Sequence, residues 1–378
     1  MGLPDLFSDS HRQPAACIVR IDGRELNDLY PALSEVKVET SRQHFAEATL
    51  TFDTHRLEDG VWTVQDDERL LPWRKVTIEA DFGGPGPQEV MSGYVKSVRA
   101  GYPQDHGSAQ VTVTCQDHSL LLDRQHVNHR WGHDAPISDG QIVREIAGLR
   151  HVGLQGEPAS GQQVRDLLQN TTDIRFLRRR AQANGYELIF HQGRLYFGEM
   201  RLSGQPQPTI LVYAGQDTNC IRFDIDNDGH KPDRVAFQVA AEAGSESSTV
   251  EVEPDLPLLG TESADSTGAA LDPFVWRPQR QGVDDEQQMR AIAQRMVNEQ
   301  SFKIKVTGEL DGTMYANVLR VAETVDVDGV GERYSGTYYV DAVTHKFDAN
   351  GYAMSFTLLR NAYGASTRGI SNPLQRYS

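Results

Sequence analysis

Apolar and polar residues alternate most regularly near the C-terminal end of the chain. The run 352–358 is apolar at every second position: Tyr352, Met354, Phe356 and Leu358. This period of two is typical of a strand with one buried face. A second β-rich run, 335–347, precedes it, and the intervening Asn350-Gly351 dipeptide favours a type I′ turn. The pattern therefore predicts a β-hairpin over residues 335–362.

A fainter version of this hairpin occurs in the first third of the chain. The run 92–98 begins with Ser-Gly, as the run from Ser335 does, and a second run then alternates at Ala109, Val111, Val113 and Cys115. Both copies follow the order strand, Gly-rich loop, Ser-Gly strand, turn and amphipathic strand. We infer two copies of one β-meander, each forming much of a small barrel or sandwich.

Between the two copies the spacing of apolar residues becomes helical. Ser138 and Gln141 fit a capping box, followed by apolar residues at helical spacing: Ile142, Val143, Ile146 and Leu149. Val164, Leu167 and Leu168 predict a second short helix. A third helix is predicted from Thr172 to a C-terminal Gly185, and a hairpin over 186–197 completes an α+β insertion.

After the insertion the pattern again predicts strands, at 210–214, 221–225 and 234–240. The segment 243–282 is rich in Ser, Gly, Asp, Glu and Pro, which predicts a long polar loop. An amphipathic helix, capped by Asp284, is predicted over 284–300. The chain then enters the second copy of the meander.

The predicted fold is mainly β with an α+β insertion: two similar tube-type β-barrel domains and a small mixed domain. The predicted segments are an N-terminal arm (1–14), a first barrel (15–115), the insertion (116–208), a second barrel (209–362, with the polar loop 243–282 and the helix 284–300) and a C-terminal tail (363–378).

Composition narrows the classes of function. A length of 378 residues predicts more than one core. The net charge of −16 repels phosphates, so sequence-specific DNA binding is not expected, although an acidic lumen would let DNA slide past. No apolar run approaches the roughly 20 residues of a membrane span, and the first residues lack a secretory signal. Three distant cysteines (Cys17, Cys115 and Cys220) form neither a disulfide framework nor a zinc knuckle, which favours a reducing cytoplasm; Cys17 and Cys115 are expected to be buried on predicted strands.

Two clusters of acidic residues or histidines are candidate metal sites. Asp224, Asp226 and Asp228, followed by Gly229, match the first half of an EF-hand loop, but position 12 is Val235 where a bidentate Glu is needed. A turn between strands is therefore favoured. The second cluster, His126, His129 and His133 with Asp134, lacks the spacing of known zinc sites and favours an irregular loop or a subunit contact.

The chain contains a run of three consecutive arginines. Arg178, Arg179 and Arg180 are expected near a helix C-terminus, where cations are favoured; a solvated face is the first interpretation and an acidic partner the sharper one.

No catalytic motif is found. The sequence contains no Gly-x-Ser-x-Gly elbow, Walker loop or His-Glu-x-x-His motif. We therefore predict no enzyme, no cofactor, and no catalytic, cofactor-binding or metal-binding residues.

The order of these features resembles the phage late control protein D family, the hub of contractile tails, which is related to the hub part of type VI secretion spike proteins. The resemblance covers residues 15–362 and rests on the following segments: 142–149 after the Ser-Asp cap, 172–177 leading to 184–186, 193–197, the helix 289–297, 336–343 with His345, and 351–362.

The resemblance implies two tube-like barrels per chain and a homotrimer. Such a trimer adapts a sixfold tail tube to a threefold spike, and the internal repeat agrees, because each chain must then present two equivalent surfaces. The implied partners are the spike, the tail tube protein or a tube initiator, and other baseplate proteins. The location would be the virion tail baseplate, assembled in the host bacterial cytoplasm. Because the sequence ends soon after 360–362, we expect the spike to be a separate chain.

The sequence is compatible with two other classes of function. One is a peptidoglycan hydrolase at the tail tip, and the other is a calcium-dependent, β-rich binding module that uses Asp224, Asp226 and Asp228. The source, whether a phage, a tailocin or another injection system, is left open by the sequence.

Overall fold

The structure is a computed structural model that describes residues 14–104, 108–239, 248–265, 271–278 and 286–365. The predicted N-terminal arm and C-terminal tail lie almost wholly outside these residues. Among the helices of the described ranges, none is long and apolar enough to cross a membrane.

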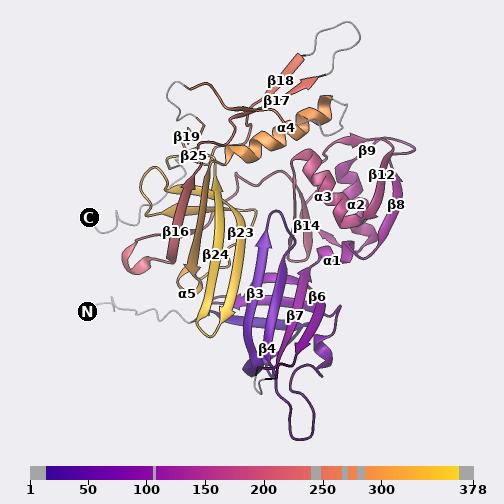
Figure 1. Cartoon of the computed structure of the whole chain (residues 1–378), viewed down its shortest axis with the longest axis vertical. Helices are drawn as coiled ribbons and strands as arrows, with labels where there is room; N and C mark the ends of the chain where they lie inside the picture. Colours follow the sequence, from indigo (N-terminus) through magenta and orange to yellow (C-terminus); the bar gives the residue numbers. More distant parts are fainter. Residues whose placement is uncertain (1–13, 105–107, 240–247, 266–270, 279–285, 366–378) are drawn as a thin grey trace, which may run out of the picture.

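The chain is mainly β, as predicted, and most strands belong to one large sheet (Figure 1). The first half of this sheet comprises β1 (Ala16–Ile21), β2 (Arg24–Glu25), β3 (Leu33–Ser41), β4 (Glu47–Asp53), β5 (Lys75–Asp81), β6 (Gln88–Gly101) and β7 (Gln110–Asp117). The second half comprises β15 (Gln207–Leu211), β16 (Cys220–Asn227), β21 (Ile304–Asp311), β22 (Thr324–Asp328), β23 (Gly336–Asp348) and β24 (Gly351–Arg360).

The alternation in the sequence explains how these strands pack. On β24, Tyr352, Met354, Phe356 and Leu358 are all buried, and the residues between them are more exposed. The equivalent apolar residues of β3, β4, β7 and β21 join them in one core that both halves share. Apolar burial of this extent supplies most of the stabilisation of such a sheet, at roughly 25 cal/mol per Å² removed from water.

The two halves repeat one strand order, which supports the predicted internal repeat. The first half runs β3-β4-β7-β6-β5-β1 and the second runs β16-β21-β24-β23-β22-β15. The matching strands also follow one another in the same order along the chain: β1 corresponds to β15, β3 to β16, β4 to β21, β5 to β22, β6 to β23 and β7 to β24. All pairings in the first half are antiparallel, including that of β1 with β5. In the second half the one exception is β15, which lies parallel to β22.

Two irregularities also repeat and fix the equivalence residue by residue. A register shift between Val95 and Ser97 on β6 matches the shift between Val340 and Ala342 on β23. Another, between Leu33 and Glu35 on β3, matches the shift between Cys220 and Arg222 on β16. Such β-bulges insert one residue into one strand. The equivalence they set differs by two residues from the Ser-Gly match that the sequence suggested.

The segment between the halves forms a separate cluster of buried residues around two helices. Its elements are α1 (Ser119–Leu122), β8 (His126–Trp131), β9 (Ile137–Ser138), α2 (Asp139–Leu149), β10 (Gly153–Leu154), β11 (Gln163–Val164), β12 (Leu167–Thr172), α3 (Asp173–Asn184), β13 (Glu187–His191) and β14 (Arg194–Gly198). The capping box at Ser138 and the left-handed Gly185 are confirmed. The helix predicted over 164–168 is wrong, because these residues form β11 and β12, which pair with β9 and β8.

The remaining elements lie at the end of the molecule drawn uppermost in Figure 1. They are β17 (Arg234–Val239), β18 (Ser248–Val252), β19 (Glu262–Ser263), β20 (Val275–Trp276), α4 (Glu286–Ser301) and β25 (Ala362–Tyr363). The short helix α5 (Gly312–Tyr315) lies elsewhere, beside the lower end of β24 in Figure 1. The prediction of a long polar loop over 243–282 is wrong at β18, β19 and β20, which are strands. The helix is confirmed over Glu286–Ser301, but its predicted cap, Asp284, lies outside the described residues.

Three short 3-10 turns complete the described elements: Tyr30–Ala32, Glu68–Leu70 and Gly215–Asp217.

Candidate functional site: the join between the two repeats

The two halves are joined by backbone pairing between β3 and β23. The register runs from Ala342 opposite Ser41 to Phe347 opposite Val36. β23 thus pairs with β22 through its first residues and with β3 through its last ones. The join makes an eight-stranded antiparallel sheet in the order β16-β21-β24-β23-β3-β4-β7-β6.

One face of this eight-stranded sheet packs on the core and the other is polar. The middle of the polar face carries hydroxyl side chains: Thr49, Thr51, Thr112, Thr114, Thr307, Ser355 and Thr357. Charges of both signs surround them, and several form ion pairs: Lys37–Glu39 (2.9 Å), Lys96–Glu47 (3.1 Å), Lys346–Glu35 (3.2 Å) and Arg222–Asp224. The polar face is therefore of mixed charge and is not uniformly acidic.

A buried arginine crosses the join where β3 turns into β4. Arg42 Nε donates to Glu187 Oε1 at 2.6 Å, Nη2 to Glu299 at 2.9 Å and Nη1 to Asp341 at 3.1 Å. The side chains of Arg42 and Glu187 are only 7% and 4% exposed. Burial alone lowers the pKa of Arg42, but the nearby carboxylates more than offset this and hold the pKa raised.

The same network includes a buried tyrosine of β23. The Tyr339 hydroxyl donates to Glu187 Oε2 at 2.6 Å, and the Arg42 guanidinium lies over the Tyr339 ring. Glu187 comes from β13 and Glu299 from α4. This charge network therefore ties the insertion and α4 to both halves of the sheet.

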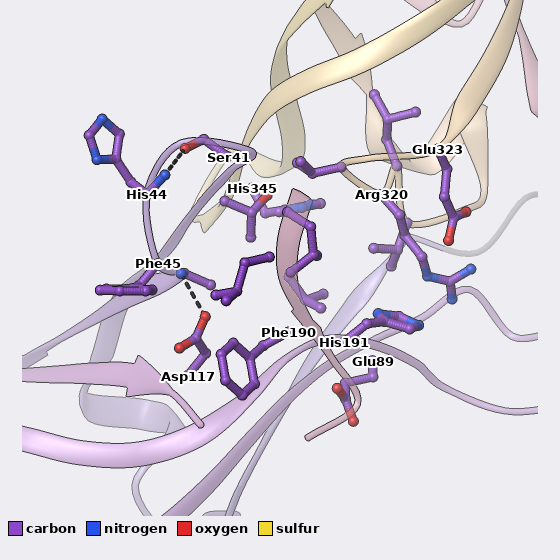
Figure 2. Close-up of a pocket in the computed structure, with 18 of the residues that line it drawn as sticks. Ser41, His44, Phe45, Glu89, Asp117, Phe190, His191, Arg320, Glu323 and His345 are labelled. Atoms are coloured by element: carbon purple, nitrogen blue, oxygen red, sulfur yellow. Dashed lines mark hydrogen bonds between the residues drawn. The ribbon is translucent and has the colours of Figure 1, made fainter. Parts of the chain in front are cut away.

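A small cavity lies beside the join (Figure 2). Its volume is about 60 Å³, room for a few water molecules. Burial raises the pKa of Asp117, whose Oδ2 accepts from the Ala46 amide at 2.9 Å. Burial also raises the pKa of Glu89 and lowers that of His191 to about 4. Burial thus disfavours the charged form of all three groups, and the cavity is too small for a polymeric substrate.

His345 also lines this cavity and belongs to the join itself. It lies on β23 opposite Val38, its side chain is buried, and Nδ1 is 2.8 Å from the Tyr352 hydroxyl. Burial lowers the pKa of His345 to about 3, with a smaller contribution from the positive charge of Arg320.

The structure separates the acidic residues that resemble an EF-hand. Asp224 and Asp226 lie on β16, Asp224 pairs with Arg222, and Asp228 accepts from the His230 amide at 2.9 Å in the following turn. Val235 is buried on β17. Within the described ranges, no three His, Cys, Asp or Glu side chains are grouped closely enough to hold a metal ion.

The histidine cluster is spread along a two-stranded ribbon instead of an irregular loop. His126 and His129 lie on β8, and His133 follows it. His126 Nε2 is 2.7 Å from Asn170 Oδ1, and His133 Nδ1 is 3.2 Å from Asp166 Oδ1. His129 contacts the Trp131 ring edge-on.

The three consecutive arginines lie in the middle of α3, so the prediction that they sit near its C-terminus is wrong. Arg180 donates to the buried Asp139 at 2.6 Å, and Arg178 lies over the Phe45 ring at 3.8 Å. Arg179 is exposed. Two of the three residues therefore have packing roles inside the molecule.

The strand order and the mixed insertion define a phage tail protein fold. The structure is similar to the 43 kDa tail protein of prophage MuSo2 from Shewanella oneidensis, with a TM-score of 0.66 and 13% identity, covering 92% of this chain and 98% of that one. It is also similar to a tail protein from Neisseria meningitidis MC58, with a TM-score of 0.64 and 15% identity over 92% and 97% of the two chains.

A third similar structure is the E. coli c3393 protein, described as a component of the type VI secretion system. Its TM-score is 0.51 and its identity 12%, over 92% of this chain and 78% of that one. The sequence matches the model of the Alg8 N-terminal domain family over residues 12–349, and the chain belongs to this family. No curated protein matches the sequence.

Proposed function

We propose that the protein is the trimeric hub of a contractile phage tail, or of a related injection system, and acts without enzymatic chemistry. In this role it adapts the sixfold tail tube to a threefold spike, as the late control protein D resemblance implies. Its partners would be the spike, the tube protein or a tube initiator, and other baseplate proteins, in the baseplate of the virion tail.

The observation that carries this proposal is the repeated strand order with its repeated bulges. A chain with two equivalent halves presents six equivalent surfaces when three copies assemble, which is what a sixfold partner requires. The fold shared with phage tail proteins supports the same role. We retain the division into barrels over 15–115 and 209–362, with the insertion over 116–208, as part of this proposal.

The polar face of the eight-stranded sheet would line the lumen of such a ring. Its hydroxyl groups and paired charges offer few isolated cations to a passing polyanion, so nucleic acid would not be retained. A strongly acidic lumen, which the net charge of −16 suggested, is not required for this. A mixed, hydroxyl-rich wall has the same consequence.

The oligomeric state in solution tests this proposal. Light scattering of the purified full chain over a range of concentrations should reveal a species with the mass of three 42.1 kDa chains. A protein that stays monomeric at every concentration, both alone and with its spike, would contradict the hub.

A further inference from the structure

The eight-stranded sheet ends in two unpaired strand edges. Within the described residues, β16 pairs with β21 alone. At the other end, β5 and the segment before it accompany β6 only as far as Val95, which exchanges backbone hydrogen bonds with Trp73 and Arg74. From residue 96 to 101, β6 pairs with β7 and with no other strand of the described ranges. Figure 1 shows β16 and β6 at opposite ends of the sheet.

The two free edges are the repeat equivalents of the strands that pair at the join. The bulges make β6 equivalent to β23 and β16 equivalent to β3. Within one chain, β23 pairs with β3. The equivalent strands β6 and β16 therefore present the same kind of edges, but in one chain they do not pair with each other. Unpaired edges of this kind are templates for pairing with another chain.

Exposure of the apolar residues supports this correspondence. At the join, Val36, Val38, His345 and Phe347 are each at most 6% exposed. Their equivalents at the free edges are Phe223 and Ile225 on β16 and Ala100 and Tyr102 at the end of β6. Phe223 and Ile225 are half-buried, Ala100 is exposed and Tyr102 is 55% exposed. The free edges therefore expose the positions that pairing covers at the join.

We propose that the β6 edge of one copy pairs antiparallel with the β16 edge of a second copy, in the register of the join. This inference rests on the proposed trimer and names the strands that build it. Transferring the β3–β23 register through the bulges places Ser97 opposite Asp228, Arg99 opposite Asp226, and Ala100 opposite Ile225.

The charges at this register are complementary. Arg99 and Asp226 are both exposed on the polar face, and the register places them directly opposite each other. Directly opposed side chains on one sheet face interact, and opposite charges there are favourable. Because the two edges differ, the contact is head-to-tail, and it closes into a ring when the rotation between copies is that of a symmetric oligomer. Closure removes every free edge of the eight-stranded sheet.

A pair of cysteines tests the register. The full chain carrying both Arg99→Cys and Asp226→Cys would be oxidised and run without reductant. Opposed residues in an antiparallel pair have Cα atoms about 4.5–5.5 Å apart, within the range that a disulfide spans. Inside one chain the two positions are separated by the whole sheet, roughly 30 Å, so only links between chains form. We expect covalent dimers and closed trimers.

The matched control combines Arg99→Cys with Asp224→Cys, which lies on the same face but two residues, about 7 Å, out of register. It should link at least about tenfold more slowly. As a second test, Arg99→Asp and Asp226→Arg should each weaken assembly about tenfold, and the double exchange should restore it.

The outcomes separate this inference from the proposed function. A trimer by mass that links no better at 99 and 226 than in the control, and that tolerates both charge changes, would overturn the proposed pairing and leave the hub intact. Absence of any trimer would contradict the hub itself.

Discussion

Replacing Arg42 with methionine is expected to lower the free energy of unfolding by about 3–5 kcal/mol. The substitution leaves the Glu187 carboxylate, whose side chain is only 4% exposed, without its cation beside the Tyr339 hydroxyl. A buried charge deprived of its partner costs far more than the ion pair contributes, because the carboxylate is desolvated in either case.

Urea unfolding at fixed protein concentration measures this effect. The matched control is Arg74→Met, which breaks an ion pair with Asp22 whose side chains are 44% and 45% exposed. That change should cost no more than about 1 kcal/mol. Adding Glu187→Gln to Arg42→Met should recover part of the loss. Equal, small effects at Arg42 and Arg74 would show that the network at the join does not hold the parts together.

Acidification is expected to weaken the fold through His345. Its pKa is about 3 in the folded chain, against 6.5 as its ordinary value, because it is buried beside Tyr352 and near Arg320. As pH falls below 6.5, His345 takes up a proton in the unfolded chain but stays unprotonated in the folded chain. Stability is therefore lost between pH 6.5 and about 3, by about 1.4 kcal/mol per pH unit for this one group.

The variant His345→Gln isolates this contribution. It should be less stable than the parent at pH 7, and the gap should shrink as pH falls, since the glutamine takes up no proton. The same substitution at His133, which is 65% exposed, separates the effect of burial from the loss of a histidine. A gap between the parent and His345→Gln that is constant from pH 7 to pH 4.5 would refute the assignment.

The sequence carried the hairpin and the helix caps because these are local. The chain turns between Asp348 and Gly351, but the two central residues are Ala349 and Asn350 and neither has a positive φ, so the predicted type I′ turn centred on Asn350-Gly351 is wrong; Gly351 itself has a φ of 109°. Ser138 with Gln141 dictates a helix start. The repeat was also visible, but its residue match was shifted. The bulges at 95–97 and 340–342 set the true equivalence, and a bulge leaves no clear mark in an apolar pattern.

The rest of the repeat is not visible in the sequence, because paired side chains of the two halves differ in size while filling the same space together. Leu50 on β4 faces Val113, whereas the equivalent pair on β21 and β24 is Gly308 and Phe356. A Cβ on Gly308 would collide with the Phe356 ring, so the larger ring occupies the space that Leu50 fills in the other half. The packed volume is kept and the residue similarity is lost.

A short apolar run fits the helical period and the strand period equally well, and one such run led to a wrong helix prediction. Val164, Leu167 and Leu168 suit one helical turn, yet β12 pairs with β8 and leaves Leu168 57% exposed. The Arg42 network had no signal in the sequence at all. Its arginine and Glu187 are 145 positions apart, and only the tertiary structure brings them together.

In the proposed assembly, three copies close their β6 and β16 edges into one ring with six similar wall segments. Cryo-electron microscopy of the purified assembly, viewed down its axis, tests this most directly. We expect threefold symmetry, a continuous inner wall built from three copies of the eight-stranded sheet, and an open lumen lined by its polar face. An assembly of another symmetry, or a trimer in which these sheets remain separate, would contradict it.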